Sequence, residues 1–196
     1  QTQKQNHLAG QDITTNQYNF VAWLLKSKRQ HTATVQGNAQ SYTILEEYEY
    51  DHAGRETGMH HTINSNDRIY VCEKDYDERD LLLQKKLHQT SGFGGDFLQY
   101  VDYRYNIRNW LTDINNINFN AGCNFVAATQ TVTPEGQQPT DLFAMKLSYN
   151  FSAVPNTAGR FNGNIAAMEW KIGCNDLQAY RFTYDKFDRF TSATYG

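Results

Sequence analysis

The sequence predicts an all-β fold made of successive antiparallel β-hairpins that form a curved, twisted sheet. Three observations lead to this prediction. Apolar and polar residues alternate with a period of two along several segments. Aromatic residues make up 14% of the chain, with 13 tyrosines and 11 phenylalanines, and these residue types favour strands. A Tyr-Asp or Tyr-Asn pair recurs at separations of 26 to 44 residues, which is the range of repeat architectures.

Four segments show the alternation most clearly. Their apolar faces carry Tyr42, Ile44, Tyr48 and Tyr50, then Val101, Tyr103 and Tyr105, then Phe143, Met145, Leu147 and Tyr149, and finally Tyr180, Phe182 and Tyr184. Glu46 is an exception on the first of these faces. Each segment is therefore expected to be a half-buried strand. The tyrosine that ends each face is expected to stack against its counterparts on neighbouring hairpins.

Each Tyr-Asp or Tyr-Asn pair is expected to open a tight turn. The six pairs are Tyr18-Asn19, Tyr50-Asp51, Tyr76-Asp77, Tyr105-Asn106, Tyr149-Asn150 and Tyr184-Asp185. Asp and Asn are favoured at the first position of a type I turn, because their side chains cap backbone amides. Three residues later, Gly54 suits a left-handed conformation, and Asp80 and Asn109 tolerate it next best. Because such a turn is a standard hairpin connection, Arg55 and Arg189 begin return strands, where they can lie over tyrosine rings or pair with carboxylates.

Two segments fit more than one secondary structure. Residues 16–30 and 77–92 could each form a short amphipathic helix, whereas the register of the repeat favours a strand in both. Residues 116–141 lack the motif and carry two of the three prolines, so an irregular insertion, either a loop or a hairpin, is expected there. The whole chain, residues 1–196, is expected to form a single repeat-built β domain of about six units.

Composition and charge narrow the classes of function. The net charge of −3 and a pI near 6.1 give no basic footprint for nucleic acid or an anionic membrane. No apolar run approaches the roughly 20 residues that span a bilayer. The chain opens at Gln1 in a polar stretch without a secretory signal, so it is interpreted as a piece of a longer protein. The three cysteines, Cys72, Cys123 and Cys174, are far apart, and free thiols are expected.

No motif predicts catalysis, and neither a cofactor nor a metal site is expected. His60 and His61 are adjacent on an expected strand and point to opposite faces, so they cannot easily bind one ion together with His52. They are interpreted as surface histidines. No GxSxG elbow surrounds a serine, and the glycines of residues 91–95 lack the lysine and the strand-to-helix frame of a phosphate-binding loop. The chain is therefore not expected to be an enzyme.

A carbohydrate-binding surface is the alternative that the aromatic content leaves open. Exposed rings stack on pyranose faces, while Asn, Gln and Asp side chains bind hydroxyl groups. The residues that would stack on a sugar are Trp23, Trp110 and Trp170. Trp23 and Trp110 occupy the same repeat position, just after the turn, and this periodicity favours a structural role for both.

With these units in view, the sequence resembles the YD-repeat, or RHS (rearrangement hotspot), family of large bacterial surface and secreted proteins. "YEYDHAGRE" is similar to that family's YxYDxxGRL core, "VDYRYNIRNWL" to a variant reading YNIRGWL, and "FNGNIAAMEW" with "YRFTYDKFDRFTSA" to a further stretch of its repeat regions. The resemblance covers residues 13–196. Departures occur at Glu56, in place of an aliphatic residue, at Asn109, in place of glycine, and in "YDERDLL", which lacks the glycine. The structural motif positions are Tyr48, Tyr50, Asp51, Gly54, Arg55, Tyr76, Asp77, Tyr103, Tyr105, Asn106, Trp110, Tyr149, Asn150, Phe182, Tyr184, Asp185 and Arg189.

The resemblance implies hairpins that spiral into a tyrosine-rich shell, which in complete family members encloses a C-terminal toxin. It implies that this chain is a non-catalytic structural segment of an extracellular or bacterial cell-surface protein. Its partners would be neighbouring repeats and a C-terminal effector of the same polypeptide. Self-association through open sheet edges is also expected, because "SATYG" stops where another hairpin would pair. Complete members cleave themselves at an aspartate in an Asp-Pro motif, and since no Asp-Pro occurs here, self-cleavage is assigned to no residue.

Overall fold

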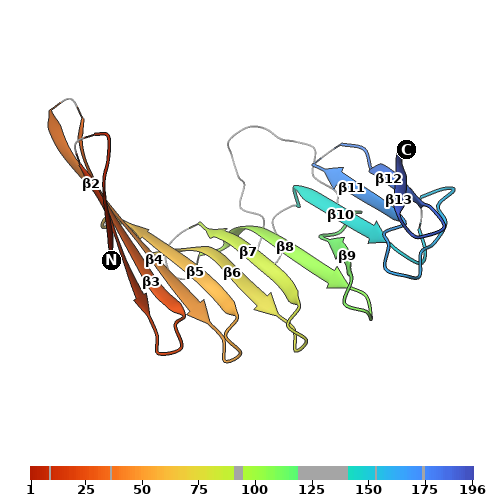
Figure 1. Ribbon diagram of the computed structural model, residues 1–196, viewed down its shortest axis with the longest axis horizontal. Coiled ribbons are helices and arrows are strands. Elements are labelled where there is room, and N and C mark those ends of the chain that lie inside the picture. The colour runs from red at the N-terminus through yellow and green to blue at the C-terminus, as the bar shows by residue number, and fades with distance from the viewer. Residues whose placement is uncertain (9, 36, 91–94, 119–140, 153, 174) are drawn as a thin grey trace. The chain divides into compact units, whose positions relative to one another are not determined.

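The computed structural model describes residues 1–196 except 9, 36, 91–94, 119–140, 153 and 174. The described residues form thirteen β-strands and no helix, and therefore no helix that could span a membrane. The strands are β1 (Thr2–Gln5), β2 (Gln11–Tyr18), β3 (Leu24–Val35), β4 (Asn38–Tyr50), β5 (Glu56–Ile63), β6 (Ile69–Tyr76), β7 (Leu82–Gln89), β8 (Phe97–Tyr105), β9 (Leu111–Ile114), β10 (Phe143–Ser148), β11 (Ala167–Ile172), β12 (Gln178–Tyr184) and β13 (Phe190–Tyr195). The order of the strands in the sheet is their order in the sequence, with β1 and β13 as the end members (Figure 1). The predicted all-β fold of successive antiparallel hairpins is confirmed.

The chain divides into two compact units. Gln1–Asp75 and Lys85–Leu98 form the first, and Tyr76–Gln84 and Gln99–Gly196 form the second. The single repeat-built domain over residues 1–196 stays a prediction. The insertion expected at residues 116–141 lies outside the described residues over 119–140, as do Cys123 and Cys174. Cys72 is a buried free thiol, and burial raises its pKa.

In the first unit, β3 and β4 form a long antiparallel pair that joins two of the hairpins closed by Tyr-Asp or Tyr-Asn turns. Their ladder runs through ten opposed pairs, from Lys26↔Glu47 to Val35↔Asn38. Residues directly opposite each other in a ladder share a face of the sheet. One face therefore carries Lys26, Glu47 and His60, since Glu47 also opposes His60 on β5. The two segments that fitted either a helix or a strand contain β3 and β7, so the strand prediction is confirmed for both.

The second unit buries a face that the alternation did not single out. On β10, Phe143 is 37% exposed, whereas Ala144 on the opposite face is fully buried. Ser148, on the same face as Ala144, is also buried, and Ile117 packs against Ala144. Small side chains let a connecting segment approach the strand backbone, and this explains why the face with smaller residues is the better covered one.

Candidate functional site

Five of the six Tyr-Asp or Tyr-Asn units end in the same turn. The residues that begin these turns are Asn19, Asp51, Asp77, Asn106 and Asp185. In each turn, Oδ1 of the first residue accepts hydrogen bonds of 2.8–3.1 Å from the backbone N–H groups two and four residues later. The N–H group of the first residue donates to the carbonyl four residues later at 2.9–3.0 Å. Its carbonyl accepts a hydrogen bond from the N–H group three residues later. Each turn thus satisfies four of its five backbone N–H groups internally.

The fourth residue of each turn has the left-handed conformation that a bulged hairpin needs. The φ angles are 65° at Ala22, 85° at Gly54, 64° at Asp80, 62° at Asn109 and 60° at Asp188. The left-handed positions expected at Gly54, Asp80 and Asn109 are therefore observed. Register shifts lie next to four of these turns, directly before the tyrosine that precedes the Asp or Asn. The repeat is thus a type I turn with a β-bulge.

The arginines after the turns pair with the aspartate that begins the same turn. Arg55 Nε lies 2.6 Å from Asp51 Oδ2, and Arg189 Nε lies 2.7 Å from Asp185 Oδ2. Of the two roles expected for these arginines, the structure has the carboxylate pairing. The hydrogen bond from the backbone N–H of Arg189 lowers the pKa of Asp185, and the Arg189 side chain lowers it further. At Asp51 burial alone would raise the pKa, but the hydrogen bonds from Arg55 and Ala53 outweigh it, so this pKa is also lowered.

Four of the six tyrosines in the Tyr-Asp and Tyr-Asn pairs bridge to a neighbouring hairpin. We call them the bridging tyrosines, and they are Tyr50, Tyr105, Tyr149 and Tyr184. Their hydroxyl groups donate hydrogen bonds to the backbone carbonyls of Leu24 (2.9 Å), Leu82 (3.0 Å), Leu111 (2.9 Å) and Ile165 (2.7 Å), respectively. The first three acceptors directly follow the turn of the preceding unit. Burial raises the pKa of all four tyrosines, so each stays a protonated donor at neutral pH.

Two tryptophans reinforce this connection between hairpins. The Trp23 ring lies 5.2 Å from the Tyr50 ring, and a Cβ atom on Gly54 would lie only 2.4 Å from Trp23 Cζ2. Trp110 lies 5.1 Å from Tyr149 in the same way. These contacts occupy both rings, so they agree with a structural role for the tryptophan after the turn.

The sixth unit, at Tyr149-Asn150, departs from the pattern. Asn150 Oδ1 is buried and has no hydrogen-bond partner among the described residues. The Arg160 N–H instead donates to the Tyr149 carbonyl at 2.7 Å, and residues 149–166 connect β10 to β11. A Cβ atom on Gly159 would lie 2.0 Å from the Asn150 carbonyl oxygen, so the long connection closes tightly here. The tight turn predicted at Asn150 is therefore wrong, although Tyr149 keeps its bridging hydrogen bond.

The other motif residues lie on the strands. They are Tyr48 on β4, Tyr76 at the end of β6, Tyr103 on β8 and Phe182 on β12. Tyr48 donates a hydrogen bond to Glu46 Oε2 at 3.3 Å, and the Phe182 ring lies beside the Tyr180 ring at 6.5 Å. They thus contribute to the strand faces and do not converge with the turns on one site.

The sequence did not predict the polar cluster around His60. His60 is 1% exposed, so its interpretation as a surface histidine is wrong. Its Nε2 lies 2.7 Å from Glu49 Oε1, and its ring centroid lies 3.6 Å from that of Tyr70. The Tyr70 hydroxyl donates to Glu49 Oε2 at 3.2 Å, and burial together with the Glu49 charge raises the pKa of Tyr70. As expected, His61 points to the other face, opposite Ile69.

An ion-pair network lies on the same face as His60. Glu47 Oε1 lies 2.6 Å from Lys26 Nζ, and Glu47 Oε2 lies 3.0 Å from Arg68 Nε. The hydrogen bond from Lys26 lowers the pKa of Glu47 against the opposing effect of burial. These groups therefore neutralise one another.

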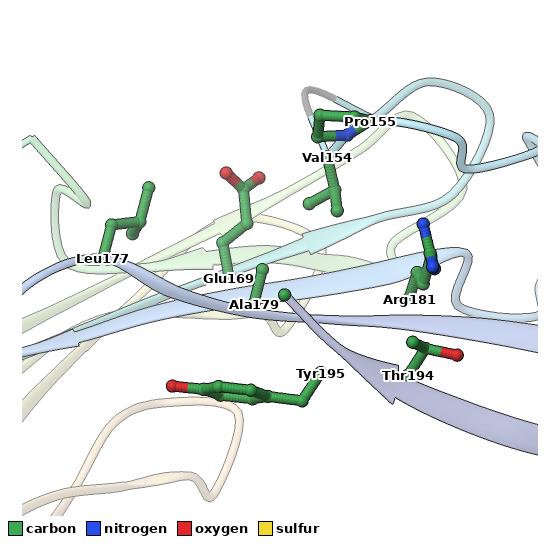
Figure 2. A pocket seen from close by; sticks show the side chains of 9 residues that line it. Val154, Pro155, Glu169, Leu177, Ala179, Arg181, Thr194 and Tyr195 are labelled. Atoms are coloured by element: carbon green, nitrogen blue, oxygen red, sulfur yellow. The ribbon is translucent and has the colours of Figure 1, made fainter.

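A pocket of about 370 Å³ lies over β11 and β12 in the second unit. The Glu169 carboxylate points into it from β11, and Val154 and Pro155 lie above (Figure 2). Glu169 is only 7% exposed, and its Oε2 has no hydrogen-bond partner among the described residues. No sequence pattern indicated this pocket, because the alternating residues of β11 do not show which face a later loop covers.

The third tryptophan of the carbohydrate alternative, Trp170, has a different environment from the other two. Its ring stacks on Tyr180 at 5.3 Å with an interplanar angle of 18°, and the Tyr195 ring lies 6.3 Å away. Tyr195 is 58% exposed. Among the described residues, no three His, Cys, Asp or Glu side chains are grouped so that they could hold a metal ion.

Comparisons with known proteins add one distant likeness. No protein-family model matches the chain, and a search of curated proteins gave no match. Among solved structures, the chain is similar to a porin-like protein from Bacteroides uniformis ATCC 8492. The sequence identity is 11% and the TM-score 0.32, over 94% of this chain and 82% of that chain. A likeness at this TM-score carries no argument about fold or function, so the YD-repeat resemblance rests on the sequence motifs alone.

Proposed function

We propose that the chain is a non-catalytic structural segment of a large secreted or cell-surface repeat protein. In this proposal its hairpins form part of a β-shell that encloses or displays another part of the same polypeptide. The observation that carries the proposal is the bridge from tyrosine hydroxyl to backbone carbonyl, which recurs at four positions. A contact repeated from hairpin to hairpin is what a wall needs, whereas a catalytic site needs one convergent group of side chains.

The polar groups of the repeat support this role. In the five regular turns, the Asp or Asn side chain accepts hydrogen bonds from the backbone of its own turn. The Arg55 and Arg189 side chains donate hydrogen bonds to the aspartates of their turns. Such groups shape and stabilise a connection. The partners in this proposal are the neighbouring repeats and a C-terminal effector of the same polypeptide.

Limited proteolysis of the longer polypeptide tests the proposal, with fragments followed by mass. A shell predicts that the region beyond the repeats survives until the repeats themselves are cut. Digestion of that region first, while the repeats stay intact, would show that nothing is enclosed and would overturn the shell. The isolated downstream region, expressed without the repeats, is the control, and it should be cut at the rate of an unprotected domain.

A carbohydrate-binding surface is the second candidate, and the exposed Tyr195 ring beside Trp170 favours it. Flat aromatic surfaces of this kind bind sugar rings. A titration with oligosaccharides, followed by tryptophan fluorescence, tests this candidate. A saturable response that Trp170→Ala abolishes and Trp23→Ala leaves unchanged would support it. No response from the folded chain would exclude this surface as a lectin site for the sugars tested.

A further inference from the structure

We propose that the pocket over β11 and β12 binds a small zwitterion of the α-amino acid type. In this proposal Glu169 receives the ammonium group and Arg181 the carboxylate. The proposal is independent of the shell role, and it rests on a buried carboxylate, a guanidinium beside it and an apolar wall, all of which line one pocket.

The carboxylate of Glu169 is the central observation. The residue is 7% exposed, and Oε2 has no hydrogen-bond partner in the described part of the chain. A buried carboxylate oxygen without a partner is costly, and the cost is relieved by a donor from a ligand. Lys146 lies directly opposite Glu169 in the ladder, yet it forms no ion pair with Glu169 among the described residues. An ammonium group that enters the pocket would supply the missing charge-assisted hydrogen bond.

Arg181 supplies the complementary charge. Ala179 is the residue opposite Glu169 on β12, and Arg181 follows two residues later on the same face. Diagonal neighbours of this kind have their backbones about 7–8 Å apart. Both charged side chains rise to the same side of the sheet, on either side of Val154 (Figure 2). Arg181 forms no ion pair among the described residues, so its planar guanidinium is available for two-point binding of a carboxylate.

Part of the remaining lining suits an apolar side chain, while Thr194, Tyr195 and Gly196 complete the pocket. Val154, Pro155, Leu177 and Ala179 line the pocket beside the two charged groups. A volume of about 370 Å³ is near the lower end of small-molecule sites, which span about 300–1,000 Å³. A ligand of amino-acid size therefore fits better than a drug-sized one, and its aliphatic part would lie against Leu177 and Val154.

Titrations with leucine and its two halves, followed by NMR and calorimetry, test the proposal. The probes are L-leucine, 3-methylbutylamine, which lacks the carboxylate, and 4-methylpentanoate, which lacks the amine. L-leucine should bind saturably, and each half should bind about tenfold more weakly, since one charged contact is lost. Glu169→Gln, which keeps the shape of the side chain, should weaken the binding of L-leucine by a similar factor. Arg181→Gln should do the same.

Two controls keep the outcome clear. Glu78→Gln removes an exposed glutamate from the turn between β6 and β7 and should leave L-leucine binding unchanged. Circular dichroism of each variant establishes that the fold is retained. No saturable binding of L-leucine to the folded chain would overturn the proposal. Equal affinity for L-leucine and 3-methylbutylamine would overturn it too, because Arg181 would then make no contact with the carboxylate.

Discussion

The hydroxyl group of Tyr50 donates a hydrogen bond of 2.9 Å to the carbonyl of Leu24, which lies 26 residues earlier in the chain. Leu24 is the first residue of β3 and directly follows the turn that Asn19 begins. One side chain therefore connects the turn end of the β4–β5 hairpin with the turn end of the β2–β3 hairpin. The same relationship joins Tyr105 to Leu82.

Removal of this hydroxyl group should destabilise the chain measurably. Tyr50→Phe keeps the ring against Trp23 and deletes one half-buried hydrogen bond, so we expect a loss of about 0.5–1.5 kcal/mol in the free energy of unfolding. Urea denaturation followed by tryptophan fluorescence measures it. Tyr42→Phe is the matched control, because its hydroxyl group donates a hydrogen bond of 2.9 Å to the exposed Gln40 side chain. Equal effects of the two variants would contradict a role for the Leu24 contact.

The contact between Trp23 and Gly54 allows a second test. Gly54 has a φ of 85°, and a Cβ atom there would lie 2.4 Å from the Trp23 ring. Gly54→Ala should therefore combine the left-handed strain of about 1–2 kcal/mol with displacement of the tryptophan. Gly37→Ala is the control, since φ is 79° and nothing lies within 4 Å of the added methyl group. A larger loss of thermal stability at Gly54 than at Gly37 is expected, and equal losses would show that the ring contact adds nothing.

The turn aspartates should make stability depend on pH in the acid range. The pKa of Asp185 is lower in the folded chain than its usual 3.8. Its contribution to the free energy of unfolding is therefore present above pH 3.8 and is lost as the pH falls through the folded pKa. Asp185→Asn keeps the turn, as Asn106 does, but loses the charge and the Arg189 pair. The variant should be less stable than the parent at pH 6, and the gap should narrow below pH about 4.

Thermal unfolding at a series of pH values measures this difference. Asp176→Asn, at an exposed position, is the control. The difference in stability between Asp185→Asn and the parent could instead stay constant down to pH about 2. That result would mean that the ionised carboxylate of Asp185 does not stabilise the fold.

The sheet edges predict self-association. β1 and β13 are the end members of the strand order, and each pairs with a single neighbouring strand. Unpaired strand edges present backbone donors and acceptors that other strands can use. We expect sedimentation velocity to show larger species as the concentration rises. Ala193 opposes Phe182, whose N–H donates to Ala166 on the far side, so the Ala193 N–H points away from β12. Ala193→Pro should therefore reduce the association without removing a donor of the β12–β13 ladder. A strictly monomeric species at high concentration would contradict the prediction.

The parts of the structure that the sequence could predict are local. The turns follow from residues within five positions of each other, so their Asp or Asn cap and their left-handed fourth residue could be derived from spacing. The hydrogen bond from Tyr50 to Leu24 depends on how one hairpin docks on another, and spacing does not reveal it. The burial of His60 depends likewise on Glu49 and Tyr70 from neighbouring strands.

The same distinction explains the wrong predictions. The tight turn expected at Asn150 fails because residues 149–166 form a longer connection that closes through Arg160. The buried face of β10 depends on Ile117 packing against Ala144, which alternation alone cannot reveal. The sequence does not indicate the pocket at Glu169 for a related reason, since Val154 and Pro155 from the connection before β11 form part of its wall.

Replacement of all four bridging tyrosines by phenylalanine tests most directly whether these contacts hold the hairpins together as a wall. Four hydrogen bonds on separate hairpins, at about 0.5–1.5 kcal/mol each, should add to a loss of about 2–6 kcal/mol in the free energy of unfolding. Amide hydrogen exchange should also become faster where the acceptors lie, around Leu24, Leu82, Leu111 and Ile165. Unchanged stability together with unchanged exchange at these positions would contradict the central role given to the bridging tyrosines.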